Sequence, residues 1–155
     1  MLILLDIDGV MLPAKSWSSP ELLEDGFSMF NTKAVRALNN IIDSSNADVL
    51  LTTSHKGRYT VEKWKEIFKS RGVRLNNLNK LPDNLENLNR RDEISNWFST
   101  YKLQEDFVII DDDSSLNGLS IYLKKRLVLT KPLIGLNNPH VQESLDILNT
   151  PLILA

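Results

Sequence analysis

Short runs of apolar residues alternate along this 155-residue chain with longer segments in which apolar residues recur every three or four positions. A continuous apolar run that stops on a polar residue is typical of a strand buried on both faces of a parallel sheet. Such runs occupy residues 2–5, 47–52, 107–110 and 127–129, and we expect a further short strand at residues 73–75.

The spaced segments predict four amphipathic helices. Asn31 or Thr32 would cap the first helix, Thr60 and Gly72 would bound the second, and the last would follow Pro139. Their apolar positions are Ala34, Leu38, Ile41 and Ile42; Val61, Trp64, Ile67 and Phe68; Ile94, Trp97, Phe98 and Tyr101; and Val141, Leu145 and Leu148. We interpret the tryptophans and phenylalanines of these stripes as core packing rather than as a base-stacking surface.

Strands that alternate with helices predict an α/β fold with an open, mainly parallel sheet, in which ligands bind beyond the carboxyl ends of the strands. Two stretches lack a regular period and are expected to be loops: residues 10–30 and the Asn-rich residues 76–89. Neither stretch is long enough for a folded cap domain above the site. The length is typical of one domain, here residues 1–155.

Composition excludes several kinds of site. The chain has no cysteine, which rules out disulfides, cysteine-based zinc sites and a thiol nucleophile. It has only two histidines, so any metal ion must be held by oxygen ligands. The apolar run at residues 2–5 is too short for a signal sequence or a membrane span, and we expect a cytoplasmic protein that does not contact membranes.

Charge is unevenly distributed, although the formal net charge is only -2. Most charged residues between positions 55 and 80 are basic, including Lys56, Lys63, Lys65 and Lys80. This cationic stretch follows one of the predicted strand ends, so it is positioned to attract a polyanion. The solvated face of a helix explains the same pattern equally well.

Polar side chains suited to phosphate chemistry follow three of the predicted strands. They are Asp6 and Asp8, then Thr52 and Thr53, then Asp111 and Asp112. In an extended segment, residues two apart share a face, so Asp6 and Asp8 can address one ligand. Two ionised carboxylates cannot be buried there cheaply without a cation or hydrogen-bond donors, so this pattern predicts a metal ion.

Four motifs in this order resemble the haloacid dehalogenase superfamily of phosphotransferases. They are Leu-Leu-Asp-Ile-Asp-Gly-Val at 4–10, Leu-Leu-Thr-Thr-Ser at 50–54, Arg-x-x-Glu-Ile at 90–94 and Val-Ile-Ile-Asp-Asp-Asp at 108–113. Within the superfamily the chain is most similar to the capless domain of Swiss Army Knife RNA repair proteins, which also carries Arg-x-x-Glu-Ile and a late Gly-Leu, here Gly135 and Leu136. The resemblance implies a three-layer, Rossmann-like fold without a folded cap.

The resemblance also implies a two-step phosphoryl transfer through an aspartyl-phosphate. Asp6 would be the nucleophile, and Asp8 would protonate the leaving oxygen and then activate water. Mg²⁺ would be held by Asp6, the backbone carbonyl of Asp8 and Asp111, with Asp112 nearby.

Phosphate binding is assigned by the same resemblance. Thr52 would donate a hydrogen bond to a phosphate oxygen, and Arg90 would neutralise charge on the transferring group. Thr53 competes with Thr52 for its role, and Arg91 and Lys80 compete with Arg90. His55 and Lys56 stand where this branch tends to have a Trp-Arg pair, so the roles of these two residues are open.

The sequence therefore predicts a Mg²⁺-dependent phosphatase that acts on a phosphomonoester. An uncapped site makes few contacts with a small substrate, so we expect a preference for the phosphorylated end of a nucleic acid. The alternative is a catalytically weak phosphate-binding module in a repair or signalling assembly.

Overall fold

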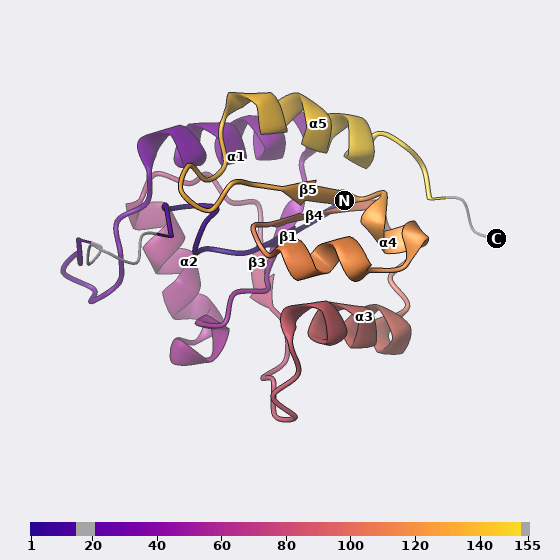
Figure 1. Cartoon of the computed structure of the whole chain (residues 1–155). Coiled ribbons are helices and arrows are strands. Elements are labelled where there is room, and N and C mark those ends of the chain that lie inside the picture. Colours follow the sequence, from indigo (N-terminus) through magenta and orange to yellow (C-terminus); the bar gives the residue numbers. More distant parts are fainter. Residues whose placement is uncertain (15–20, 153–155) are drawn as a thin grey trace.

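The computed structural model describes residues 1–14 and 21–152, which form one parallel sheet between helices (Figure 1). The strands are β1 (Leu2–Leu5), β2 (Asp48–Leu51), β3 (Leu78–Lys80), β4 (Phe107–Asp111) and β5 (Leu127–Leu129). Their order across the sheet is β3-β2-β1-β4-β5, and every pairing is parallel. The chain crosses from one side of β1 to the other before β4, so the carboxyl ends of β1 and β4 mark the position where such sheets bind ligands.

Among the described residues, four helices connect successive strands, and a fifth follows β5. They are α1 (Thr32–Ser45), α2 (Val61–Ser70), α3 (Arg90–Tyr101), α4 (Ile121–Lys124) and α5 (Asn138–Leu148), with 3-10 turns η1 (Lys56–Arg58) and η2 (Ser114–Gly118). Three of them begin at a side-chain cap: Asn31 accepts from the N–H of Lys33, Thr60 from that of Lys63 and Asn89 from that of Asp92. Of the two candidate caps for α1, the structure selects Asn31, and the expected start of α2 at Thr60 is confirmed.

Side chains alternate between the two faces of the sheet and build a core on each. Ile3 and Leu5 of β1 pack with the apolar stripes of α1, α2 and α5, whereas Leu4 packs with those of α3 and α4. The sheet thus lies between two helical layers, as Figure 1 shows. The expectation of a three-layer, Rossmann-like α/β fold with a parallel sheet is confirmed.

The expectation of a strand at residues 73–75 is wrong. The strand of this region is β3, which lies inside the stretch expected to be a loop. The backbone N–H of Val73 donates to Phe68 and completes the end of α2, so it is not free for a sheet ladder. Leu78 is the one fully apolar residue of β3 and pairs with Val49. One inward residue on an edge strand gives almost no pattern to detect.

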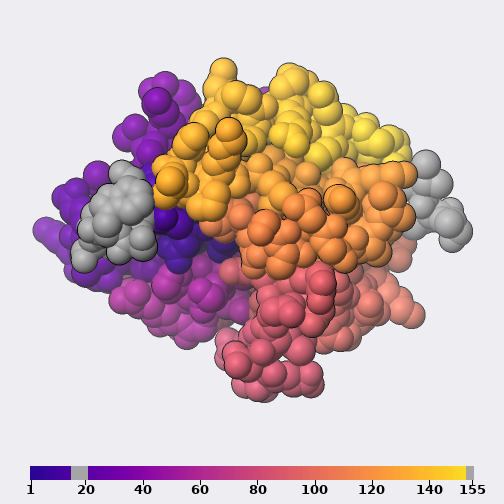
Figure 2. Space-filling model, viewed as in Figure 1, coloured from indigo at the N-terminus to yellow at the C-terminus, as the bar shows by residue number. Residues whose placement is uncertain are grey.

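No folded cap domain is present among the described residues. After β1, the residues from 21 to 31 form only a bridge between Leu22 and Ser28, and an ion pair between Asp25 and Arg71 ties this segment to the end of α2. Residues 82–89 form a short loop that projects beside α3 (Figures 1 and 2). Within the described part of the chain, no helix is both long and apolar enough for a membrane span.

Candidate active site

The register of the sheet brings three polar residues to one level. Leu5, the last residue of β1, pairs with the residues that immediately precede Thr52 and Asp111. The N–H of Asp6 donates to the carbonyl of Ile110 at 3.1 Å, and that of Thr52 donates to the carbonyl of Leu5 at 2.9 Å. Asp6, Thr52 and Asp111 therefore lie side by side at the carboxyl ends of three neighbouring strands.

Asp6, Asp111 and Asp112 form a carboxylate cluster in which one ligand oxygen of each lies within 4.8 Å of the others. Asp6 and Asp111 are buried. One oxygen of Asp111 accepts from the N–H groups of Asp112 and Asp113, whereas its Oδ2 is buried without a hydrogen-bond partner. A buried carboxylate oxygen without a hydrogen bond is costly, so these oxygen ligands fit a hard divalent cation.

The cluster shifts the acidity of its members. Burial, reinforced by repulsion from Asp111 and opposed by Arg90, raises the pKa of Asp6 to about 9. Burial likewise raises the pKa of Asp111 to about 6, and it raises the pKa of Asp112. In the absence of a cation the cluster therefore retains a proton at neutral pH, and a bound cation would displace that proton.

Arg90 is the cation nearest to this cluster among the described residues. It is the first residue of α3, directly after the cap Asn89. One Nη donates to the carbonyl of Thr52, and the guanidinium lies 3.5 Å from an oxygen of Asp6 and 3.8 Å from one of Asp111. A planar guanidinium in this position can contact a phosphate group held above the strand ends.

The competing cations point elsewhere. Arg91 lies 3.4 Å from the carboxylate of Asp92 and packs against Gly118. The ammonium group of Lys80 donates to the carbonyls of Lys56 and Tyr59, so it braces the turn after β2. Of the three candidates, the geometry favours Arg90 for the contact with phosphate.

Thr52 and Thr53 are both fully buried, but their hydroxyls differ. The hydroxyl of Thr53 accepts from the N–H of His55, whereas that of Thr52 has no hydrogen-bond partner. A buried hydroxyl normally has a partner. The geometry therefore favours Thr52 as the residue that donates to a ligand.

Asp8 does not join the carboxylate cluster. Its side chain is half-exposed and accepts a hydrogen bond from Nε2 of His55 at 2.7 Å. The His55 and Phe27 rings pack in a T-shaped arrangement, with 5.8 Å between ring centroids. The sequence had left the role of His55 open, and the structure shows that this residue orients the carboxylate of Asp8.

Gly9 allows the sharp turn after this pair. Its φ is +77°, and a Cβ at this position would lie 2.0 Å from an oxygen of Asp112. The hydroxyl of Thr130 donates to the carbonyl of Gly9 at 2.6 Å. Only glycine fits where the first and fourth strand ends come this close.

The structure assigns an internal contact to Lys56, whose role the sequence had left open. It is buried, and its ammonium group lies 2.7 Å from a carboxylate oxygen of Glu93. Arg71 is equally buried against Asp25. Two interpretations of residues 55–80 had been left open, a cationic patch and the solvated face of a helix. Since Lys56, Arg71 and Lys80 have internal partners, these three residues fit neither interpretation.

The family described as HAD domain in Swiss Army Knife RNA repair proteins matches residues 2–141. The chain belongs to this family. A comparison with curated proteins found no match. Membership in the HAD family confirms the resemblance seen in the motifs and places the chain in a superfamily of phosphatase-type hydrolases. All four HAD motifs contribute residues to the site described above, and the carboxylate cluster could bind the metal ion that such domains typically use.

Proposed function

We propose that the protein is a Mg²⁺-dependent phosphomonoesterase that acts through an aspartyl-phosphate on Asp6. The observation that carries this proposal is the buried carboxylate of Asp6 at the switch point of the sheet, flanked by Arg90 and by the unpartnered hydroxyl of Thr52. A carboxylate, a guanidinium and a hydroxyl donor brought together at neighbouring strand ends are the parts that phosphoryl transfer needs.

Asp6, Asp111 and Asp112 would hold Mg²⁺ with their carboxylates, and the carbonyl of Asp8 would complete the protein ligands. The bound ion supplies positive charge that keeps the carboxylates ionised and offsets the charge of the phosphate. Arg90 and Thr52 orient the phosphate oxygens towards Asp6.

In the first step an oxygen of Asp6 forms a bond to phosphorus, while the bond from phosphorus to the ester oxygen breaks. Asp8 has to be protonated for this step, and it gives its proton to that leaving oxygen. In the second step Asp8 takes a proton from water, the water oxygen bonds to phosphorus, and the bond to Asp6 breaks. Inorganic phosphate and the free alcohol are released, and both aspartates return to their initial state.

We also propose that the natural substrate is a phosphorylated nucleic-acid end. The family description refers to RNA repair, and the described residues place no folded cap over the strand ends. An open site accommodates the end of a large substrate, which can draw binding energy from contacts away from the phosphate.

The test is phosphate release from an aryl phosphate and from 5′- and 3′-phosphorylated oligonucleotides, with Mg²⁺ and after chelation. Turnover should require the cation and disappear in Asp6→Asn. Asp8→Asn should retain more activity on the aryl phosphate, because a good leaving group needs no proton. Undiminished release after complete chelation, or an active Asp6→Asn variant, would refute the proposal; binding of phosphate without turnover would favour the phosphate-binding module instead.

A further inference from the structure

A groove runs from Arg90 along α3 and is not explained by the chemistry of the phosphate. Its inner part has a volume of about 520 Å³ and is lined by Ser54, Arg90 and Asp113 among others. Its outer part has a volume of about 280 Å³ and extends to Trp97. The two parts share the lining residues Asp83, Asn84, Leu88 and Glu93, so they are neighbours.

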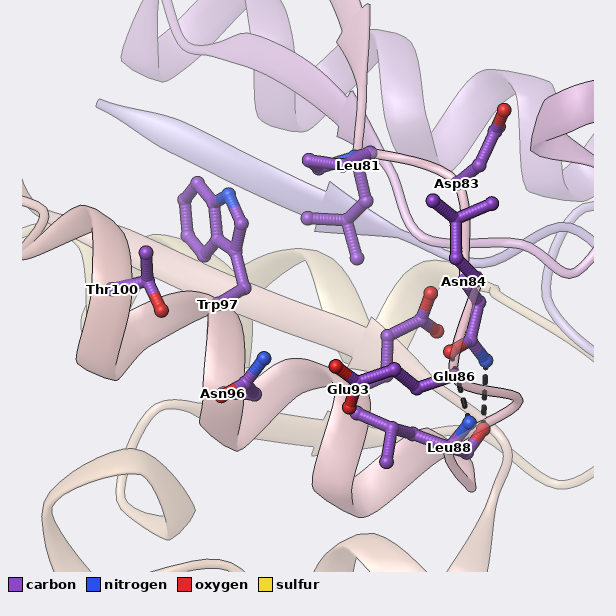
Figure 3. Close-up of a pocket in the computed structure, with 11 residues that line it drawn as sticks. Leu81, Asp83, Asn84, Glu86, Leu88, Glu93, Asn96, Trp97 and Thr100 are labelled. Atoms are coloured by element: carbon purple, nitrogen blue, oxygen red, sulfur yellow. Dashed lines mark hydrogen bonds between the residues drawn. The ribbon is translucent and has the colours of Figure 1, made fainter.

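The floor of the outer part is apolar. Leu81, after β3, and Trp97, on α3, face each other across it (Figure 3), and Leu88 contributes a further apolar wall. Trp97 stacks on Tyr101 at 5.0 Å between ring centroids and packs against the core on the α3 side. The prediction of core packing therefore holds only in part for Trp97: its side chain packs against the core, but it is half-buried and also lines a cavity.

The wall opposite α3 is a pre-formed loop. The side-chain amide of Asn84 donates to the carbonyl of Leu88 at 2.7 Å and accepts from its N–H at 2.9 Å, as the dashed lines in Figure 3 show. The backbone between these residues turns through Asn87, whose φ is +51°. This bracing keeps the groove open without a ligand, so binding does not need to order the loop.

The polar lining of the outer part is rich in hydrogen-bond acceptors. Asp83 and Glu86 contribute carboxylates, Glu93 contributes a carboxylate that is paired with Lys56, and Asn96 adds an amide. The described residues that line this part include no lysine or arginine. Such a lining repels a second phosphate and favours a flat, apolar group that carries N–H donors. A nucleobase has this combination of properties.

Distance along α3 agrees with that occupant. Arg90 and Trp97 are seven residues apart, which at 1.5 Å per residue is roughly 10 Å along the helix axis. The sugar of a nucleotide can therefore occupy the inner part while its phosphate contacts Arg90 and its base reaches the outer part. The rest of a nucleic-acid strand has to leave the groove, because the acidic lining offers nothing to its phosphates.

We infer that this groove binds the nucleoside whose phosphate is removed, with the base in the pocket at Trp97. The inference rests on the proposed phosphatase function and specifies its leaving group. One nucleoside is recognised, either as a free mononucleotide or as the terminal nucleotide of a strand.

The experiment compares kcat/KM for a nucleoside 5′-monophosphate, for ribose 5-phosphate, which lacks only the base, and for an aryl phosphate. Base stacking predicts an advantage of about tenfold or more for the nucleotide over ribose 5-phosphate. Asn96→Trp or Thr100→Trp places an indole in the exposed mouth of the outer part and should abolish this advantage. Ser99→Trp, at an exposed position of the same helix outside the groove, should preserve it.

Equal kcat/KM for the nucleotide and ribose 5-phosphate, or an advantage that both blocking variants retain, would overturn the inference while leaving phosphatase activity on the aryl phosphate intact. If no ester is hydrolysed at all, the proposed function fails instead. Calorimetric binding of the nucleotide and of ribose 5-phosphate to the blocked and unblocked proteins then decides the inference. A 5′-phosphorylated oligonucleotide processed as well as the mononucleotide would identify strand ends as the source, and its exclusion would identify free nucleotides.

Discussion

Replacing Asp6 by Asn should stabilise the metal-free protein while it abolishes turnover. The carboxylate of Asp6 is 4% exposed, lies beside the buried Asp111 and has a pKa raised to about 9, chiefly by burial. An amide of the same shape carries no charge and needs no proton. The substitution therefore removes the free-energy cost of burying the Asp6 carboxylate, which a bound cation would otherwise offset.

The size and sign of the effect follow from proton linkage. The folded protein keeps a proton on Asp6 up to a pH of about 9, whereas the unfolded chain loses it near 3.8. Stability from this group is therefore complete below pH 4 and declines as the pH rises towards 9. At pH 7 the largest gain in the free energy of unfolding that Asp6→Asn can give is about 4 kcal/mol, because each pH unit above 3.8 costs the parent about 1.4 kcal/mol. Relaxation around the site and the proximity of Arg90 reduce this to an expected gain of about 2 kcal/mol.

Thermal unfolding with a chelator measures this gain. For a chain of this size about 2 kcal/mol corresponds to a rise in Tm of roughly 4–8 °C at pH 7, shrinking towards zero near pH 4. Saturating Mg²⁺ should stabilise the parent more than Asp6→Asn and so narrow or reverse the difference. Asp8→Asn is the matched control: Asp8 is half-exposed, and its substitution should change stability by less than about 0.5 kcal/mol. A metal-free Asp6→Asn that is no more stable than the parent at pH 7 would refute the reasoning.

Three further changes test other contacts. Gly9→Ala should abolish turnover and lower Tm, because a methyl group at φ +77° collides with the carboxylate cluster; a fully active variant would contradict this. His55→Ala should lower kcat about tenfold on alkyl phosphates but little on aryl phosphates, since it frees the proton donor Asp8, and equal loss on both would argue against that role. Asp25→Asn should lower Tm by about 2–4 °C at pH 7, and the difference should vanish as the pH falls from 4 to 2, because Arg71 lowers the pKa of Asp25 to about 2; a difference that persists in acid would exclude this ion pair as the cause.

The central strands and the carboxylate cluster were predictable because both follow from the same local pattern, an apolar run that ends on a polar residue. A strand buried on both faces is a continuous apolar run, and the run must stop where the chain reaches the ligand. In a parallel sheet the stops of neighbouring strands fall at one edge. Asp6, Thr52 and Asp111 could therefore be placed together before any contact between them was known.

The choice among cations was not predictable, because basic residues look alike in a sequence. Arg90 reaches the carboxylate cluster because Asn89 caps α3 and Arg90 is the first residue of the helix. If α3 began one residue later, Arg91 would face the cluster instead. Helix phase at a terminus depends on the cap that tertiary packing selects. Likewise the edge strand β3 contributes one apolar side chain to the core, too few to show a period.

The basic residues after β2 show how distant partners change the meaning of a charge pattern. Lys56 finds Glu93 from the opposite helical layer, and Arg71 finds Asp25 from the segment after β1. Both ion pairs join residues that are far apart in the sequence, so a local charge pattern cannot reveal them. Basic residues that looked exposed in the sequence are therefore neutralised inside the fold. The outer part of the groove that leads away from Arg90 is lined by the acids Asp83 and Glu86, together with Glu93, whose charge is balanced by Lys56. This distribution of charge disfavours a second phosphate along the groove, and it is the reason for proposing that the groove binds a single nucleoside rather than a polyanionic strand.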